Sequence, residues 1–255
     1  EDRDGAIWIG SYTEGVSRLK QGRIENFGTA KGLPSVDIRV LYQDRAGTVW
    51  AGTKSGLARF NGRVFVPVRD PGAPLEGVVA MLEDRSGTLW IGTIGSLVQY
   101  RDGRFIDLIN SFALPHHTYN LTAIHQDRAG TMWFGTSLGL VKQQGGQYQV
   151  FTKAEGLPSN DIKAIVEDAQ GGLWIGTYGG VSYLRDGRFT NYTTANGLVG
   201  NRVRSLHLDA AGVLWIGTYD SGLSRLKEGQ IFNITRQQGL ANEGVFQILE
   251  DRRGN

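Results

Sequence analysis

The stretch that decides the fold is Asp168-Ala169-Gln170-Gly171-Gly172-Leu173-Trp174-Ile175-Gly176-Thr177. It joins a turn of the form Asp-x-x-Gly to a short apolar strand, which carries a tryptophan and ends in Gly-Thr or Gly-Ser. All six tryptophans of the chain stand in this pattern, 40 to 43 residues apart: Trp8, Trp50, Trp90, Trp133, Trp174 and Trp215. A repeat of this period is typical of solenoids, arrays and propellers.

Around each tryptophan the sequence predicts four short strands. In the fifth repeat these are 161–167, 173–176, 181–184 and 189–192. The last two are joined by Arg185-Asp186-Gly187-Arg188, in which Asp-Gly supplies the positive φ angles of a tight hairpin turn. Four antiparallel strands that recur in this way predict an all-β chain of propeller blades. The large tryptophan rings are expected in the core, and the turn aspartates are expected to accept backbone N–H groups of their own turns.

We expect the two ends of the chain to share one blade. The chain begins at the end of a first strand, Glu1-Asp2, and finishes with a complete one at 243–251. The prediction is one domain over 1–255, a six-bladed β-propeller of four-stranded antiparallel blades that is closed without exposed strand edges. Its blades are 244–255 with 1–34, then 35–74, 75–117, 118–158, 159–199 and 200–242. The alternative is an arc of a seven-bladed propeller, whose open edges would favour association, for example as a homodimer.

Composition and charge exclude several classes of function. The 27 basic and 25 acidic residues give a net charge of +2, which offers no general reason to expect nucleic acid as a partner. The absence of cysteine excludes disulfides, a thiol nucleophile and Cys-ligated metals. No apolar run reaches the roughly 18–20 residues that span a bilayer. The opening Glu1-Asp2-Arg3-Asp4 is no signal peptide. We therefore expect a piece of a longer protein, in contact with a membrane only through its other parts.

Three phrases of the chain share a longer pattern. Residues 156–181 read Gly-Leu-Pro-Ser-Asn-Asp-Ile, then Ile-x-Glu-Asp, Leu-Trp-Ile-Gly-Thr and Gly-Gly-Val, and 32–57 and part of 239–251 are closely similar. This pattern resembles the two-component regulator propeller repeat, and the resemblance covers essentially the whole chain. It implies a periplasmic or extracytoplasmic sensor region of a membrane-bound bacterial regulator, such as a hybrid histidine kinase or a diguanylate cyclase. Several members of that family respond to oligosaccharides.

Polar side chains gather where the innermost strands begin. Arg39, Lys163 and Arg204 each stand five residues before the aspartate that ends the strand, and Arg202 stands seven before it. Together they could form a cationic patch that suits a carboxylate or a sulfate. Loops on the same face add further candidates for stacking on a sugar and reading its hydroxyls: Tyr12, Tyr178, Tyr219, Asp220, Tyr119 and His117. The structural alternative is that Asp37 and Asp161 pair with these cations in a closed ionic ring.

The histidines are weaker candidates for chemistry. His116-His117 lies in the longest loop, at 110–119, and could bind a metal, but no third ligand accompanies the pair. His125 and His207 occupy a position that is apolar in the other repeats, so we expect them to be packed side chains.

The sequence contains no catalytic motif. It therefore predicts a non-enzymatic sensor that binds an oligosaccharide or another small anionic ligand at the central mouth, with no catalytic residue, metal or cofactor. Two alternatives stay open. One is a structural or interaction propeller, or an excised repeat fragment, without a ligand. The other is a propeller lyase with a metal at the mouth, for which His116, His117 and Glu76 are the suspects.

Overall fold

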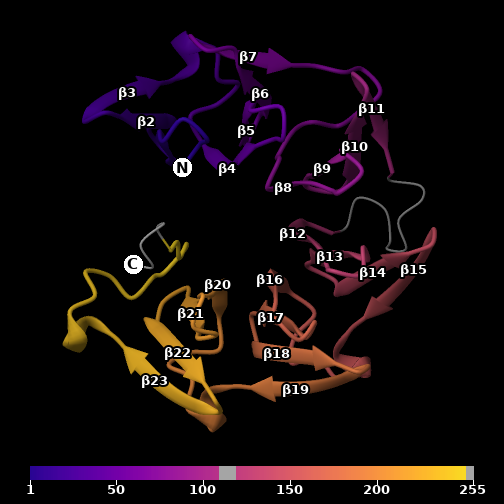
Figure 1. Cartoon of the computed structure of the whole chain (residues 1–255), viewed down its shortest axis with the longest axis vertical. Coiled ribbons are helices and arrows are strands. Elements are labelled where there is room, and N and C mark those ends of the chain that lie inside the picture. The colour runs from indigo at the N-terminus through magenta and orange to yellow at the C-terminus, as the bar shows by residue number, and fades with distance from the viewer. Residues whose placement is uncertain (109–118, 251–255) are drawn as a thin grey trace. The chain divides into compact units, whose positions relative to one another are not determined.

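The computed structural model describes residues 1–108 and 119–250 of the chain (Figure 1). It divides into two compact units, Glu1–Ile124 and His125–Asn255, and each is described by itself. The described residues form antiparallel strands joined by tight turns and a few 3-10 helices of three residues. No helix in this part of the chain is long and apolar enough to cross a membrane. The all-β prediction is therefore confirmed, whereas the single domain over 1–255 stays a prediction.

The first unit contains three sheets of consecutive antiparallel strands. The first sheet is β1 (Ile7–Gly10), β2 (Val16–Lys20) and β3 (Arg23–Phe27), followed by the 3-10 helix η1 (Thr29–Lys31). The second is β4 (Ile38–Gln43), β5 (Val49–Thr53), β6 (Gly56–Phe60) and β7 (Phe65–Val68). The third is β8 (Ala80–Glu83), β9 (Leu89–Gly92), β10 (Leu97–Arg101) and β11 (Arg104–Asp107). Each sheet is thus an antiparallel meander, and the second and third have the predicted four strands.

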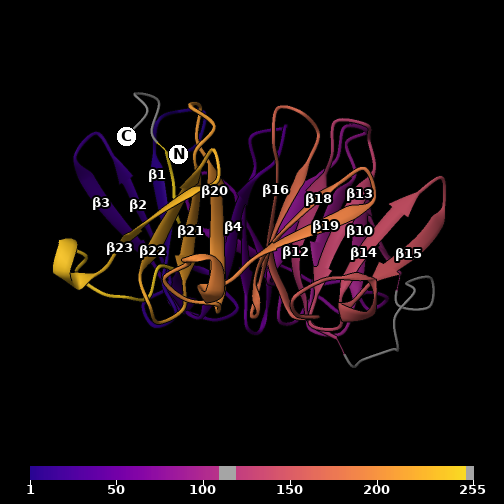
Figure 2. The ribbon, with the colours of Figure 1, turned by 90° about the horizontal axis from the view of Figure 1, so that it is seen from below.

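Three more sheets follow, and the boundary between the units falls within the first strand of the fourth. The fourth sheet is β12 (Leu121–Gln126), β13 (Met132–Thr136), β14 (Leu140–Gln144) and β15 (Gln147–Phe151), followed by η2 (Lys153–Glu155). The fifth is β16 (Ile162–Glu167), β17 (Leu173–Thr177), β18 (Gly180–Arg185) and β19 (Arg188–Tyr192), followed by η3 (Thr194–Asn196). The sixth is β20 (Val203–Leu208), β21 (Leu214–Thr218), β22 (Leu223–Lys227) and β23 (Gln230–Ile234), followed by η4 (Arg236–Gln238) (Figure 2).

The hairpin between the third and fourth strands has the predicted turn. In the fifth sheet Asp186 and Gly187 adopt φ angles of 51° and 74°, which match the right-handed twist of the two strands they join. The first, third and sixth sheets also place a residue with φ near 50° before a glycine at this turn: Gln21, Asp102 and Glu228. The hairpin therefore recurs with the repeat.

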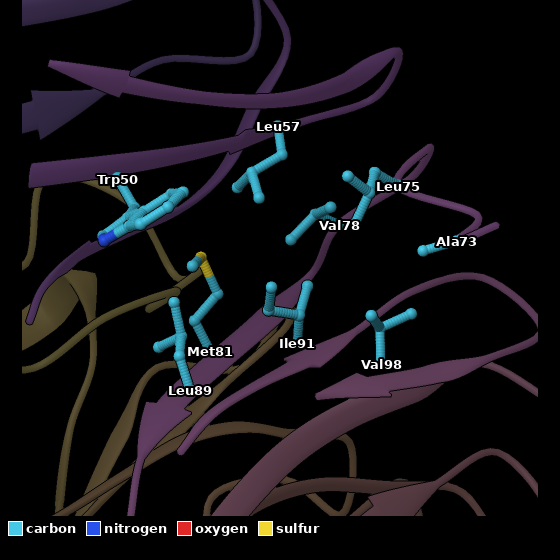
Figure 3. Close-up of a cluster of buried hydrophobic side chains, with 9 residues drawn as sticks. All are labelled: Trp50, Leu57, Ala73, Leu75, Val78, Met81, Leu89, Ile91 and Val98. Carbon is cyan, nitrogen blue, oxygen red and sulfur yellow. The ribbon is translucent and has the colours of Figure 1, made fainter. Parts of the chain in front are cut away.

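In the second to sixth sheets the tryptophan stands on the second strand, which lies in the core, whereas in the first sheet it stands on β1, whose other residues are exposed. Every residue of β5 and β13 is buried. Trp50 of the second sheet belongs to one apolar cluster with Met81 and Leu89 of the third (Figure 3). Trp50, Trp90 and Trp133 are at most 6% exposed, and the other three tryptophans are half-buried. Trp50 therefore helps to hold the second and third sheets together, as Trp133 does for the fourth and fifth.

In five of the six sheets the aspartate of the Asp-x-x-Gly turn accepts hydrogen bonds from its own turn and from the tryptophan that follows. Asp209 Oδ1 accepts the backbone N–H groups of Ala211 and Val213 at 3.0 and 2.8 Å, and Oδ2 accepts the indole N–H of Trp215 at 2.8 Å. The same indole bond, 2.7 to 2.8 Å long, is present in four other sheets: Asp2–Trp8, Asp44–Trp50, Asp84–Trp90 and Asp127–Trp133. Burial of the Asp209 carboxylate raises its pKa, but these hydrogen bonds outweigh burial and bring the pKa below its ordinary value.

The last described segment, residues 243–250, docks on the sixth sheet. Val245 N–H donates to the carbonyl oxygen of Thr218, at the end of β21, with an N···O distance of 2.8 Å. Ile38, at the start of β4, donates in the same way to Ser11 of the first sheet at 2.9 Å. Residues 243–250 therefore meet the sixth sheet as an innermost strand meets the sheet that precedes it.

The predicted fourth strand of the first sheet is not assigned in the described residues. Residues 243–250 carry no strand, and the first sheet has the order β1-β2-β3. A strand is defined by its ladder partner, and the partner that this segment would need, β1, lies in the other unit. Closure of the first blade by 244–255 stays a prediction.

Candidate ligand-binding site

Cations and aromatic rings from consecutive sheets of the second unit lie in one row, here called the cation–aromatic ladder. Its members are Lys163, Tyr178, Arg202, Tyr219, Phe246 and Arg204. Lys163 Nζ lies 4.3 Å from the centre of the Tyr178 ring, and Arg202 Cζ lies 5.2 Å from that ring and 4.4 Å from the Tyr219 ring. The Tyr219 and Phe246 rings are 5.5 Å apart, and Arg204 Cζ lies 5.8 Å from Phe246. Each cation is therefore close enough for an attractive cation–π contact.

Two of the ladder cations stand at irregular positions of their strands. The register between the first and second strands shifts at Lys163 in β16 and at Arg204 in β20. The second sheet has the same shift at Arg39 in β4. A β-bulge inserts one residue without a cross-strand partner and can turn its side chain away from the regular alternation. The bulge therefore explains how a charged side chain stands in an otherwise apolar strand.

The ladder tyrosines are held by the backbone. Tyr178 follows β17, and its N–H donates to Asp161 O at 3.1 Å. Tyr219 follows β21, and its N–H donates to Arg202 O at 2.8 Å. Each loop is thus tied to the start of its own innermost strand. This arrangement sets the aromatic ring beside the cation.

Carboxylates neutralise part of the ladder. Lys163 pairs with Asp161 at 2.7 Å, and Arg202 pairs with Asp220 at 2.9 Å. The predicted pairing of Asp161 with a ladder cation is therefore confirmed. Arg204 has no carboxylate partner among the described residues, and the Arg202 side chain is 48% exposed. The three cations of the ladder are thus accompanied by two carboxylates, Asp161 and Asp220, and the net charge of the group is positive.

The first unit contains a smaller version of the same arrangement. Arg39 Cζ lies 5.0 Å from the Tyr12 ring, and Arg39 Nε lies 2.6 Å from Asp37. The predicted Asp37 pair is therefore also present. Tyr119 differs from the expectation: its side chain is 1% exposed, so it packs in the first unit and does not offer a surface for a ligand. His117 lies outside the described residues.

Sequence reasoning missed Phe246 as a ladder member. The residue occupies the bulge register of Arg39, Lys163 and Arg204, but only the charged members of that register were chosen as candidates. In the structure it is 47% exposed beside Tyr219. The register alone, without regard to polarity, would have found it.

The two histidines at the end of the innermost strands face glutamates of the following segment. His125 Nε2 lies 3.8 Å from Glu167 Oε2, and His207 Nε2 lies 3.2 Å from Glu250 Oε2. All four side chains are at most 26% exposed. This agrees with a packing role for both histidines. In the described ranges, no three His, Asp or Glu side chains are grouped so that they could hold a metal ion; the His116-His117 pair lies outside these ranges.

Three solved structures are similar to the chain at low identity. The extracellular domain of a one-component system of B. thetaiotaomicron is 24% identical (TM-score 0.63; 100% of this chain and 37% of that chain). The extracellular domain of a hybrid two-component system of the same organism is 22% identical (TM-score 0.60; 99% and 46%). Virginiamycin B lyase from Staphylococcus aureus is 16% identical (TM-score 0.73; 91% and 82%). The chain therefore spans less than half of the two extracellular domains. These likenesses show the fold: the sheets are blades of a β-propeller.

A family model identifies the repeat itself. The model for "two component regulator propeller" matches the chain five times, at 32–55, 72–95, 114–137, 156–179 and 197–220. Four of the matches run from the loop before an innermost strand to the residues after the tryptophan strand, and the match at 114–137 begins outside the described residues. No curated protein matches the chain. The chain is built of two-component regulator propeller repeats and belongs to that family.

Proposed function

We propose that this chain is the ligand-sensing propeller of an extracytoplasmic bacterial signalling receptor, and that it binds a small anionic oligosaccharide at the cation–aromatic ladder without catalysing a reaction. The family supports the sensor role, and the likeness to extracellular domains supports the location. The ladder carries the proposal for the ligand, because cations alternate there with half-exposed aromatic rings.

The chemistry of the ladder fits an acidic sugar. Tyr219 and Phe246 are 41% and 47% exposed, and their faces suit the apolar C–H side of a pyranose ring. Arg202 retains free donors beyond its bond to Asp220, and the planar guanidinium of an arginine binds a carboxylate or a sulfate with two parallel hydrogen bonds. A ligand with both features would engage the whole row.

The test is a calorimetric titration of the protein with uronic-acid and sulfated disaccharides and with their neutral counterparts. We expect saturable binding of an acidic probe. Arg202→Ala and Arg204→Ala should each weaken it by about tenfold or more, since each removes a charged hydrogen-bond donor. Binding to the native state should also raise the unfolding midpoint.

Arg188→Ala is the matched control, because Arg188 is an exposed arginine at the start of β19, away from the ladder. It should leave binding unchanged. The proposal is wrong if no acidic probe binds, or if the two ladder variants bind as the unaltered protein does. Consumption of a probe during the titration would instead indicate an enzyme.

A further inference from the structure

The fifth sheet departs from the other sheets at its turn. Its tryptophan, Trp174, does not donate to the turn aspartate: Asp168 Oδ2 accepts the hydroxyl of Tyr183 at 2.6 Å instead. The indole N–H of Trp174 has no hydrogen-bond partner in the described part of the chain, and the ring is half-buried. Burial raises the pKa of the Tyr183 hydroxyl and the bond to Asp168 raises it further, so the phenol remains a donor at neutral pH. In the fifth sheet the indole N–H of the tryptophan thus lacks a hydrogen-bond acceptor among the described residues.

Two substitutions within the repeat produce this change. The residue opposite the tryptophan on the third strand is a cation in four sheets: Arg18, Arg59, Lys142 and Arg225. In the fifth sheet it is Tyr183, whose ring lies 4.4 Å from that of Trp174. Gly172 makes room for it, because a Cβ there would lie 2.1 Å from the Tyr183 hydroxyl. The other sheets carry side chains at this position: Ala6, Thr48, Thr88, Thr131 and Val213.

A third substitution opens the space between the fifth and sixth sheets. In three other sheets the residue after the turn aspartate is an arginine that donates to the next turn. Its Nη1 lies 2.5 to 3.0 Å from that turn's carbonyl oxygen in the pairs Arg3–Arg45, Arg45–Arg85 and Arg128–Ala169. The corresponding residue of the fifth sheet is Ala169, whose methyl group cannot reach Ala210 of the sixth.

A cavity of about 370 Å³ lies in the place left by these substitutions. Both turns line it, through residues that include Ala169 and Ala210, and so do three aromatic rings and three leucines: Trp174, Tyr183, Tyr192, Leu208, Leu214 and Leu226. Its volume falls in the range of small-molecule sites, roughly 300–1,000 Å³. Trp174, whose indole N–H has no hydrogen-bond partner among the described residues, is part of this lining.

The charged and polar groups that line the cavity indicate a neutral ligand. Asp168 and Asp209 already accept three hydrogen bonds each. Lys227 and Glu228 line the cavity with opposite charges, and Gln170 adds an amide. A ligand here meets both apolar side chains and groups that donate and accept hydrogen bonds, and a purely aromatic ligand would leave the polar groups unpaired. A pyranose ring has one apolar C–H side and a rim of hydroxyls, which match these two kinds of lining residue.

We infer that the cavity beside Trp174 is a second binding site, which takes one pyranose unit of a neutral saccharide. It stands apart from the cation–aromatic ladder, because the Asp168 turn precedes β17 and Tyr178 follows it. The two sites therefore lie at opposite ends of the same strand. The inference does not rest on the proposed function, and either site can fail without the other.

The test is a titration followed in the ¹H–¹⁵N spectrum, where the six indole N–H groups give six signals. Trp174→Phe assigns the signal of interest. We expect methyl β-D-glucopyranoside or cellobiose to shift this signal saturably at millimolar concentration. Ala169→Arg restores the arginine found in the other turns, so it should fill the cavity and weaken binding by about tenfold or more while the unfolding midpoint is kept or raised. Tyr183→Lys combined with Gly172→Thr restores the fourth-sheet arrangement and should abolish the shift.

Ala129→Arg is the matched control, since it places the same side chain in the exposed turn of the fourth sheet. It should bind as the unaltered protein does. The inference is overturned if neither saccharide shifts the Trp174 signal saturably, if Ala169→Arg binds as tightly as Ala129→Arg, or if p-cresol shifts the signal and both saccharides do not. Arg204→Ala should leave this site intact, which separates its outcome from that of the ladder.

Discussion

The fourth and fifth sheets have the same four-stranded topology, but the aspartates of their Asp-x-x-Gly turns make different contacts. In the fourth, Trp133 donates to Asp127 at 2.8 Å and Lys142 Nζ lies 5.7 Å from its ring. In the fifth, Trp174 stacks on Tyr183 and leaves Asp168 to the phenol. The fourth-sheet tryptophan is 6% exposed, whereas that of the fifth is half-buried beside a cavity. A few substitutions within a repeat can therefore turn a structural contact into a candidate site without changing the fold.

The largest expected effect on stability comes from replacing a turn aspartate that accepts the indole N–H of its tryptophan. Asp209→Ala removes the acceptor of three hydrogen bonds, including the one from Trp215. It should lower the free energy of unfolding by about 2–3 kcal/mol, because donors that are partly buried lose their partner. Urea denaturation measures the change.

Asp209→Asn tests the reason for that loss. Its amide oxygen can still accept the backbone N–H groups, while its NH₂ group would face the indole N–H, so an intermediate loss is expected. An unchanged free energy of unfolding in Asp209→Ala would contradict the hydrogen-bond account.

A smaller effect is expected where the fifth sheet has lost a side chain. Gly172→Ala should cost about 1–3 kcal/mol, because the new Cβ would lie 2.1 Å from the Tyr183 hydroxyl and the tyrosine must move. In a Tyr183→Lys background the same change should cost much less. A double-mutant cycle gives this coupling directly. Equal costs in both backgrounds would show that Gly172 is needed for another reason.

The smallest expected effect is the loss of stability at acidic pH. Hydrogen bonds lower the pKa of Asp2, Asp84 and Asp209 in spite of the burial that would raise it. A carboxyl whose pKa is lower in the folded state stabilises the fold above its unfolded pKa, near 3.9, and this contribution is lost as the pH falls through the folded pKa. The contribution of these three carboxyls to stability should therefore be constant from about pH 7 to pH 5 and decline below about pH 4. Urea denaturation at a series of pH values measures this, and Asp209→Ala should show a shallower decline.

Most of the fold can be predicted from the sequence because the repeat carries its own signals. Asp-x-x-Gly, a tryptophan strand and an Asp-Gly hairpin recur, and the meander of each sheet follows from them. The fourth strand of the first sheet is different. Nothing within 243–250 encodes a distant partner, so pattern alone cannot establish that pairing.

The candidate site could be predicted only in part. Register analysis finds Arg39, Lys163 and Arg204, since they are polar residues in apolar strands. It cannot find the cavity beside Trp174, because that cavity results from residues that are absent from their usual places: an arginine at 169 and a side chain at 172. Tyr119 was expected to face a ligand, but its ring is buried. The sequence does not show whether a large ring beside a loop turns outward or inward.

The β-bulges at Arg39, Lys163 and Arg204 also affect how such a receptor can evolve. A residue at a β-bulge has no cross-strand partner, so its substitution disturbs no cross-strand neighbour. The bulge position can therefore change with little effect on stability. Phe246 already illustrates the freedom of this register. A lineage of such propellers could therefore acquire new ligand preferences through single replacements at equivalent places in successive blades, while the turns and tryptophans stay the same.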